Sequence, residues 1–308
     1  MVRRVRGAVC AVLLALALCA CSGGAVPTRS GSQSSDTGSS PSPSPGAIQH
    51  VVVVVEENKP AQSVVGNPAA PYLNGLARSF AQASHYSAVA HPSLPNYLAL
   101  TSGTTAGITT DCNPPGGSCL DTGPNLAQAL DRAGRSWRMY AESMPAPCTT
   151  ANTPLYAVKH NPFLYFPRVT ADPAYCRSHD VPYDRLASDL ATTTSLPDFA
   201  FISPNLCDDM HDCSIAQGDA WLQNNIPRIL ESPAFTRQRS LLVITFDEGD
   251  SADNIVACIF AGPAARPRTV ASQSFTHYSL LRTIEDAWGL PPLTSEVARA
   301  TPMTSMLR

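Results

Sequence analysis

The sequence predicts an α/β fold with a mostly parallel central sheet that is covered by helices on both faces. Apolar runs typical of strands alternate with helical segments from residue 51 to residue 288, and this alternation favours parallel pairing through helical crossovers. The run at 51–55 is an unbroken stretch of valine, without the polar alternation of a half-exposed strand. Such a strand is expected to be buried on both faces of the sheet.

Each element is predicted from its own pattern, in chain order. Strands are expected where β-branched and aromatic residues cluster, and helices where apolar residues recur every three to four positions. The expected strands are 51–55, 136–140, 199–202, 240–246 and 255–260, with 87–90 as a short strand or an approach loop. The expected helices are 74–84, a helix that includes 97–100, 125–133, 184–190, 220–230 and 277–288. Residues 149–183 are rich in Pro, Tyr and Asn without a clear period, which predicts a long insertion that shapes the leaving-group pocket.

The first 47 residues are set apart from the folded body. Arginines near the start precede an apolar stretch at 8–20, and the sequence Leu-Cys-Ala-Cys that ends at Cys21 is typical of a bacterial lipobox. We therefore predict a lipoprotein signal peptide over 1–21 with Cys21 lipidated, with ordinary secretory cleavage or an uncleaved anchor as the alternatives. A disordered Ser/Pro/Gly linker is predicted over 22–47 and one catalytic domain over 48–308. The protein is expected to be exported, either anchored to the outer face of the cell membrane or secreted.

Composition limits the possible partners. The formal net charge is −3, whereas nucleic-acid binders usually show a basic stripe, so no nucleic-acid partner is expected. Three of the 10 cysteines belong to the export segment. Nearness in sequence predicts disulfides in the exported body, with Cys258 as a buried free thiol. The predicted pairs are Cys112–Cys119, Cys148–Cys176 and Cys207–Cys213.

Acidic residues follow two of the predicted strands. Glu57 and Asn58 come after the 51–55 strand, and Asp247 and Glu248 come directly after the 240–246 strand. Because the carboxyl ends of parallel strands meet at one edge of a sheet, these side chains are expected to converge there. Their oxygens suit a hard divalent cation. Solvated turns are the alternative, and Glu56 competes with Glu57, although its side chain should point to the opposite side of the strand.

Ser93 is the predicted nucleophile. It lies between His91 and Asn96 in a proline-flanked segment just before the helix that includes 97–100. A helix N-terminus favours a phosphate group, and a metal-bound serine loses its proton more readily. An ordinary helix cap is the alternative reading of this serine.

Histidines supply the other candidate groups. His211 lies among the carboxylates of 208–212, which favour its protonated form and suit it to protonating a leaving group, although a hydrated acidic loop is the alternative. His160 and His277 are candidate phosphate contacts, with structural roles as alternatives, and Lys159 is a possible anion contact. The remaining body histidines at 50, 85 and 179 are interpreted as structural or surface residues.

Several motifs, in order along the chain, resemble one known family. They are EENKP, HPSLPNYLALTSG, KHNPF, DDMHDCSIAQGDAWL, VITFDEGD and THYSLLRTIEDAWGL. Together they resemble the bacterial and fungal phosphoesterases that include acid phosphatases and phosphatidylcholine-type phospholipases C, a branch of the alkaline-phosphatase-like superfamily. The resemblance runs from about residue 50 to about residue 290 and implies a three-layer α/β/α sandwich.

The resemblance also implies roles for individual residues. Ser93 would be both nucleophile and metal ligand, with the metal also held by Glu57, Asn58, Asp247 and Glu248. The candidate substrate contacts are His91, Asn96, His160, Asp209 and His277. Because the expected ligands are mostly hard oxygens, unlike the imidazoles of two-zinc alkaline phosphatases, we expect one divalent ion, for which calcium, magnesium, iron and manganese are all candidates.

These observations lead to one expected function and two alternatives. The expected function is an exported acid phosphatase that acts on phosphate monoesters of small molecules or of phospholipid headgroups, including phosphoinositides. The membrane is expected as a partner through the lipid on Cys21. A phospholipase C-type phosphodiesterase is the first alternative, which the short chain disfavours because it lacks an obvious C-terminal lipid-facing domain. A non-catalytic surface lipoprotein is the second.

Overall fold

The computed structural model describes residues 47–308, so the predicted signal peptide, Cys21 and residues 22–46 of the predicted linker lie outside the described residues. The strands are β1 (Val51–Glu56), β2 (Ala81–Ser87), β3 (Trp137–Ala141), β4 (Asp180–Pro182), β5 (Phe199–Ser203), β6 (Leu241–Phe246), β7 (Cys258–Ala261) and β8 (Thr269–Thr276). The α-helices are α1 (Ala61–Val64), α2 (Pro71–Ser79), α3 (Ser93–Ser102), α4 (Leu126–Arg132), α5 (Pro167–Thr170), α6 (Pro173–His179), α7 (Arg185–Asp189), α8 (Ile215–Leu230), α9 (Pro233–Thr236), α10 (His277–Trp288) and α11 (Ser295–Arg299). Short 3-10 turns occur at Gly117–Cys119, Val158–His160, Pro162–Tyr165 and Thr304–Met306.

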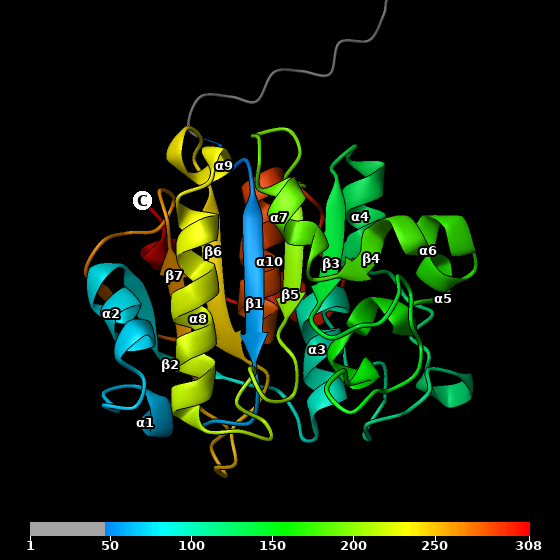
Figure 1. Cartoon of the computed structure of the whole chain (residues 1–308), viewed down its shortest axis with the longest axis horizontal. Helices are drawn as coiled ribbons and strands as arrows, with labels where there is room; N and C mark the ends of the chain where they lie inside the picture. The colour runs from blue at the N-terminus through cyan, green and yellow to red at the C-terminus, as the bar shows by residue number, and fades with distance from the viewer. Residues whose placement is uncertain (1–46) are drawn as a thin grey trace, which may run out of the picture. The chain divides into compact units, whose positions relative to one another are not determined.

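The strands form one eight-stranded sheet in the order β4-β3-β5-β1-β6-β7-β2-β8. β7 runs antiparallel to both β6 and β2, and the other pairings are parallel. α8 lies in front of β6 and α10 lies behind β1, so helices cover both faces of the sheet (Figure 1). The predicted fold class, a mostly parallel three-layer α/β/α sandwich, is confirmed.

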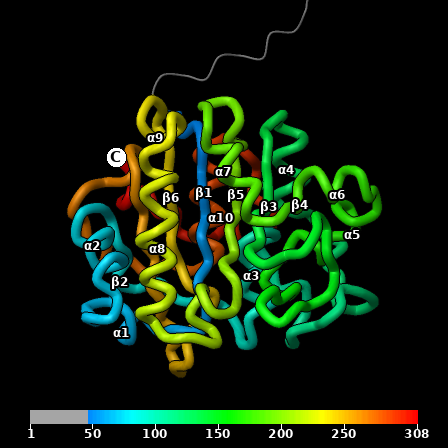
Figure 2. Tube along the Cα trace, in the orientation of Figure 1, coloured from blue at the N-terminus to red at the C-terminus, as the bar shows by residue number. Residues whose placement is uncertain are grey.

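β1 occupies the middle of the sheet and explains the valine run. It pairs with β5 on one side and β6 on the other, and each of its residues is buried. A strand enclosed on both faces and both edges can carry branched apolar side chains throughout. The trace in Figure 2 shows β1 running from the upper to the lower edge of the sheet, and the segments after β1, β5 and β6 gather at the lower edge.

Two regions differ from the sequence-based expectation. The helix expected at 74–84 is α2, which begins earlier at Pro71 and ends at Ser79, while 81–87 forms β2. Pro71 favours a helix start because its missing N–H needs no partner there. β8 was not expected, because its residues are mostly polar and lack the apolar character of a central strand.

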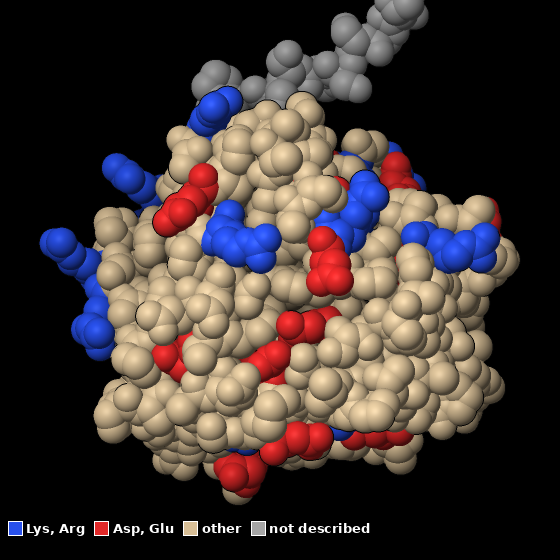
Figure 3. Space-filling view, viewed as in Figure 1, with Lys and Arg blue, Asp and Glu red and all other residues tan. Residues whose placement is uncertain are grey.

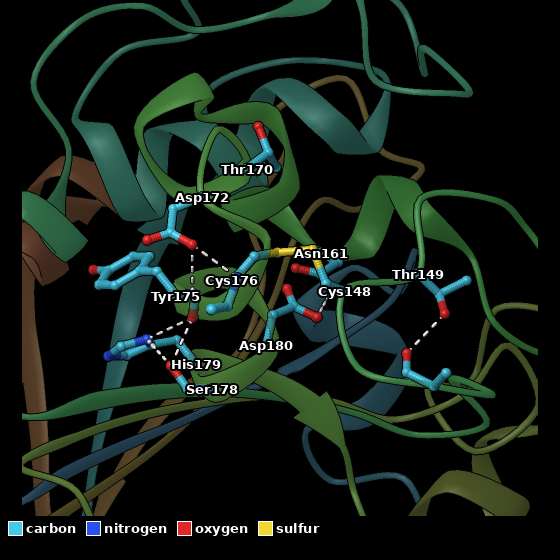
Figure 4. Close-up of a disulfide and its surroundings, with 12 residues drawn as sticks. Cys148, Thr149, Asn161, Thr170, Asp172, Tyr175, Cys176, Ser178, His179 and Asp180 are labelled. Atoms are coloured by element: carbon cyan, nitrogen blue, oxygen red, sulfur yellow. Dashed lines mark hydrogen bonds between the residues drawn. A yellow bond between two sulfur atoms is a disulfide. The ribbon is translucent and has the colours of Figure 1, made fainter.

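The expected insertion at 149–183 is a packed structure of short helices, 3-10 turns and the edge strand β4. Its aromatic residues Phe163, Tyr165 and Phe166 are fully buried. The Cys148–Cys176 disulfide joins the start of this segment to α6, beside a hydrogen bond between Asn161 and Asp180 (Figure 4). Apolar contacts and a covalent link therefore order a segment that has no helical or strand period.

The predicted cysteine pairing is confirmed. The disulfides are Cys112–Cys119, Cys148–Cys176 and Cys207–Cys213, and Cys258 is a buried free thiol. Within residues 47–308, none of the helices has the length and apolar character needed to cross a bilayer.

Candidate active site

Ser93 is the first residue of α3, at the carboxyl edge of the sheet. The residue is only 1% exposed, and its hydroxyl lies 3.2 Å from Glu57 Oε2 and 3.3 Å from Glu248 Oε1. The Lys159 ammonium donates to the same hydroxyl oxygen at 3.2 Å. Residues that follow β1, β2 and β6 therefore meet at one hydroxyl, as the sequence predicts.

Asn96 holds the loop that carries Ser93. Its side-chain oxygen accepts hydrogen bonds from the backbone N–H groups of Val89 (2.9 Å) and Ala90 (3.0 Å). Its side-chain nitrogen donates to the backbone oxygens of Ala90 (2.9 Å) and Pro92 (3.2 Å). Because these bonds use the full hydrogen-bonding capacity of the amide, Asn96 has none left for the phosphate contact that the resemblance implies.

The carboxylates beside Ser93 are buried and crowded. Asp247 Oδ1 accepts a hydrogen bond from the Asn58 backbone N–H at 3.0 Å, while Asp247 Oδ2 is buried without a hydrogen-bond partner among the described residues. Burial raises the pKa of Asp247 well above its ordinary value, and the charges of Glu57 and Glu248 raise it further. Burial also raises the pKa of Glu248, although His91 Nδ1, which contacts Glu248 Oε2, opposes this shift.

Glu57 is the exception among these acids. Burial would raise the pKa of Glu57, but the charges of His160 and Lys159 and the hydrogen bond from Tyr97 (2.7 Å to Oε1) outweigh burial and lower it. The ring of His160 bridges Glu57 Oε1 at 3.0 Å and Asp209 Oδ2 at 3.3 Å as an ion pair that lacks hydrogen-bond alignment. Although burial opposes it, the charge of Glu57 raises the pKa of His160, which favours the protonated form of this imidazole.

His160 and Asp209 therefore lie behind Glu57. The sequence predicts them as substrate contacts, but in the structure their side chains contact other protein groups instead. Both side chains are almost fully buried, and each is committed to a protein partner. The remaining oxygen of Asp209 accepts the backbone N–H of His211 at 2.8 Å. These residues orient Glu57 and the loop that carries His211.

His211 reaches the rim of the site. Its side chain is 29% exposed, its Nδ1 lies 2.7 Å from Asp212 Oδ1, and its ring centroid lies 6.0 Å from that of His160. Gly218 in α8 permits this loop position, because a Cβ there would lie 2.3 Å from Met210 Cγ. A partly exposed imidazole beside a carboxylate is suited to proton transfer.

His277 is not available to a substrate. It is fully buried, its Nδ1 pairs with the Tyr86 hydroxyl at 2.9 Å, and its Nε2 pairs with the Asp247 backbone oxygen at 2.6 Å. Burial lowers the pKa of His277 to about 4, so the ring is neutral. His277 positions the end of β6 instead of binding phosphate. His91, whose side chain is about half exposed, remains open to a ligand.

Two residues of the site, Asp111 and Tyr97, were not predicted from the sequence. Asp111 accepts hydrogen bonds from Lys159 Nζ at 2.9 Å and from the Leu94 backbone N–H at 3.0 Å. Tyr97 binds Glu57, as described above. Neither had a sequence signal of its own, because Asp111 lies in an irregular loop and Tyr97 lies within the apolar run of α3.

The donor atoms of the site are those that a hard divalent cation prefers. The carboxylates of Glu57 and Glu248 lie beside the Ser93 hydroxyl, and the buried oxygen of Asp247 that has no hydrogen-bond partner among the described residues offers a further ligand. Residues 47–308 contain no group of three or more His, Cys, Asp or Glu side chains already arranged as a metal cage. The donor chemistry therefore fits a cation, but the side chains would have to close around it. Figure 3 shows acidic side chains mainly in the lower half of one face, toward the edge where β1 ends.

Solved structures establish the fold class. A protein of the alkaline phosphatase superfamily from Vibrio parahaemolyticus matches with a TM-score of 0.56 at 14% identity, over 82% of this chain and 69% of that chain. Murine ectonucleotide pyrophosphatase/phosphodiesterase 5 matches with a TM-score of 0.54 at 11% identity, over 84% of this chain and 100% of that chain. The protein therefore has the α/β/α fold of the alkaline-phosphatase superfamily.

The chain belongs to the Phosphoesterase family, whose model matches residues 66–291, and it is a phosphoric ester hydrolase. It is 38% identical over 259 residues to the phosphatidylinositol-3-phosphatase of Mycobacterium tuberculosis, covering 83% of this chain and 82% of the relative. It is 34% identical over 235 residues to the phosphate-repressible acid phosphatase of Penicillium chrysogenum, covering 72% of this chain but only 55% of the relative. The family match includes Ser93, Asp247 and Glu248, while Glu57 and Asn58 lie ahead of it.

Proposed function

We propose that this protein is an exported acid phosphatase that hydrolyses phosphate monoesters through Ser93 with the help of one divalent cation. The observation that carries the proposal is the buried Ser93 hydroxyl at the N-terminus of α3, within hydrogen-bond distance of Glu57 and Glu248. The helix N-terminus favours the incoming phosphoryl group, and the carboxylates are placed to take the hydroxyl proton. The names of the curated relatives support phosphate esters as substrates.

In the first half of the proposed reaction, Ser93 Oγ forms a bond to phosphorus while the bond from phosphorus to the alcohol oxygen breaks. The Ser93 proton moves to Glu248, the neighbouring carboxylate whose pKa is raised by burial. The leaving alcohol takes its proton from His211. In the second half, water gives a proton back to His211 and attacks the phosphoserine. The Ser93 Oγ–phosphorus bond breaks, the carboxylate returns its proton to Ser93, and phosphate leaves.

The proposed cation would be held by oxygen atoms of Glu57, Asn58, Ser93, Asp247 and Glu248. When bound, it supplies positive charge that stabilises the deprotonated serine oxygen and the phosphoryl oxygens. Burial raises the pKa of Asp247, and the repulsion from the charges of Glu57 and Glu248 raises it further. A cation at this position would remove that repulsion.

The proposed substrates are phosphate monoesters, including those of phosphoinositide headgroups. The similarity to a mycobacterial phosphatidylinositol-3-phosphatase over most of both chains supports this substrate class. Export and attachment to the outer face of the membrane through Cys21 are part of the same proposal, because a phospholipid headgroup is met at a membrane surface.

The test is hydrolysis of p-nitrophenyl phosphate by the full-length protein in detergent, with a Ser93→Ala variant. We expect Ser93→Ala to lose turnover, and acid quenching of the wild type to trap phosphate on the peptide that carries Ser93. Ser102→Ala is the matched control, because Ser102 lies on the same helix and its hydroxyl donates only to backbone oxygens. Unchanged turnover of Ser93→Ala would reject the nucleophile.

A further inference from the structure

Lys159 places a positive charge of the chain itself beside the Ser93 hydroxyl, in addition to the proposed cation. The chain contains only two lysines, Lys59 and Lys159. Lys159 Nζ lies 3.2 Å from Ser93 Oγ, the atom proposed to attack phosphorus, and its side chain is only 17% exposed. An ammonium group is strongly hydrated, so its placement in a largely buried position needs an explanation beyond solubility.

Asp111 fixes this ammonium relative to the nucleophile. One oxygen of Asp111 accepts from Lys159 Nζ at 2.9 Å, and the other accepts from the backbone N–H of Leu94 at 3.0 Å. Leu94 directly follows Ser93 in α3, so one carboxylate links the lysine to the helix that presents the hydroxyl. A single rigid connection therefore sets the distance between Nζ and Oγ.

The segments that carry the two charged residues are themselves held in place. Asp111 precedes Cys112, which is joined to Cys119 by a disulfide and whose backbone oxygen accepts a hydrogen bond from the Tyr165 hydroxyl at 2.5 Å. Lys159 lies between Val158 and His160, both of which are buried. A lysine on a mobile surface loop would lack this restraint.

A fixed cation beside the attacking oxygen has a chemical consequence. When Ser93 Oγ bonds to phosphorus, the oxygens of the phosphoryl group come within a few ångströms of the attacking atom. Lysine is an established binder of phosphate oxygens as a point charge. A charge that is already in place stabilises the negative charge of the transition state without reorganisation.

We propose that Lys159 is a catalytic residue whose ammonium contacts the phosphoryl oxygens during attack by Ser93, and that Asp111 is a positioning residue that aims this ammonium. The inference rests on the proposed role of Ser93 as nucleophile. It extends that role, because the positive charge at the phosphoryl group then comes from the chain itself as well as from the proposed cation.

The presence of only two lysines gives a clean experiment on the full-length protein. In a Lys59→Arg parent, Lys159 is the only lysine side chain. We expect this parent to hydrolyse p-nitrophenyl phosphate like the wild type, and an added Lys159→Met substitution to lower kcat about 10²- to 10³-fold. Inorganic phosphate should protect Lys159 of the parent from acetylation, as followed by mass spectrometry of its peptide.

Asp111→Asn in the same parent tests the positioning role. We expect a fall in kcat of about 10-fold and a loss of the phosphate protection of Lys159, while thermal unfolding shows a folded protein. A merely structural carboxylate would lower stability but leave the phosphate protection of Lys159 unchanged. That result would overturn the role of Asp111.

The outcomes separate this inference from the proposed function. If Ser93→Ala is inactive but Lys159→Met keeps more than half of the kcat of the Lys59→Arg parent, only the role of Lys159 is overturned. Turnover in Ser93→Ala would overturn the proposed function. If Lys159→Met fails to fold, the acetylation experiment on the parent still decides, because acetylation unaffected by saturating phosphate excludes a phosphate contact.

Discussion

Asn96 illustrates how a polar residue next to a nucleophile can serve the backbone instead of the substrate. Its amide closes the turn between β2 and α3 through hydrogen bonds to Val89, Ala90 and Pro92. His277 does the same for the end of β6. The motifs place both residues close to the chemistry, but only the three-dimensional contacts reveal that their polar atoms are already used.

Asn96→Ala should therefore lower both stability and turnover. Each lost hydrogen bond costs about 0.5–1.5 kcal/mol, so the loss of the network is expected to cost about 2–6 kcal/mol of unfolding free energy. The loop before Ser93 should loosen, and kcat should fall with it. Urea unfolding and kinetics on p-nitrophenyl phosphate measure the two effects. A direct phosphate contact without a structural role would instead raise KM with stability unchanged.

Asp180 should make the protein less stable as the pH rises. It is fully buried and accepts a hydrogen bond from Asn161 at 3.0 Å through one oxygen (Figure 4), while its other oxygen has no hydrogen-bond partner within residues 47–308. Burial raises the pKa of Asp180 to about 7, whereas an unfolded aspartate titrates near 3.9. Between these values the folded state binds a proton that the unfolded state does not, so this residue lowers stability as the pH increases through that window.

Asp180→Asn tests this pH dependence, because an amide has no proton to lose. Between pH 5 and pH 7.5, the wild type should lose on the order of 2 kcal/mol more unfolding free energy than the variant. Chemical denaturation at the two pH values measures the difference. Equal losses in the two proteins would contradict a raised pKa at Asp180.

At the scale of elements, the end of α3 is fixed by Gly103. Its φ is 74°, and a Cβ at this position would lie 2.3 Å from Val297 Cγ2. Gly107 has nearly the same φ, 73°, but a Cβ there would meet no atom within 4 Å. The two glycines therefore separate the cost of the left-handed backbone from the cost of crowding.

Gly103→Ala should cost considerably more stability than Gly107→Ala. Both variants carry the backbone cost of about 1 kcal/mol, and Gly103→Ala adds an overpacking cost of about 1–3 kcal/mol. Thermal or urea unfolding measures both. Equal losses of stability would mean that α11, which carries Val297, moves away from the added methyl group at no cost in unfolding free energy.

Elements with a strong pattern of their own were predictable. The valine run located β1, and the apolar spacing of 277–288 gave α10 its observed bounds. The strands β2 and β8 were not predictable, because their polar residues form strands through pairing with each other and, for β2, with β7. The segment around Lys159 and Asp111 had no period, and its order comes from disulfides and buried aromatic residues. The conformation of such segments is set by tertiary contacts, and these contacts cannot be read from a single sequence.

At the scale of the whole molecule, the convergence of Glu57, Asp247 and Glu248 on Ser93 predicts a dependence on divalent cations. A chelator should abolish hydrolysis of p-nitrophenyl phosphate, and one divalent ion should restore it. A bound ion should also raise the melting temperature, because it binds only the folded arrangement of ligands. Asp247→Asn should reduce this rise. A chelated protein that keeps full activity would rule out the proposed cation.

The described chain enters at Ala47, just ahead of β1, whereas the reactive groups follow the last residues of β1 and β6. β1 alone spans roughly 20 Å. Ala47 therefore lies at the end of the domain opposite the reactive side chains. A bulky partner fused ahead of Ala47 should therefore leave the approach to Ser93 unobstructed and turnover unchanged.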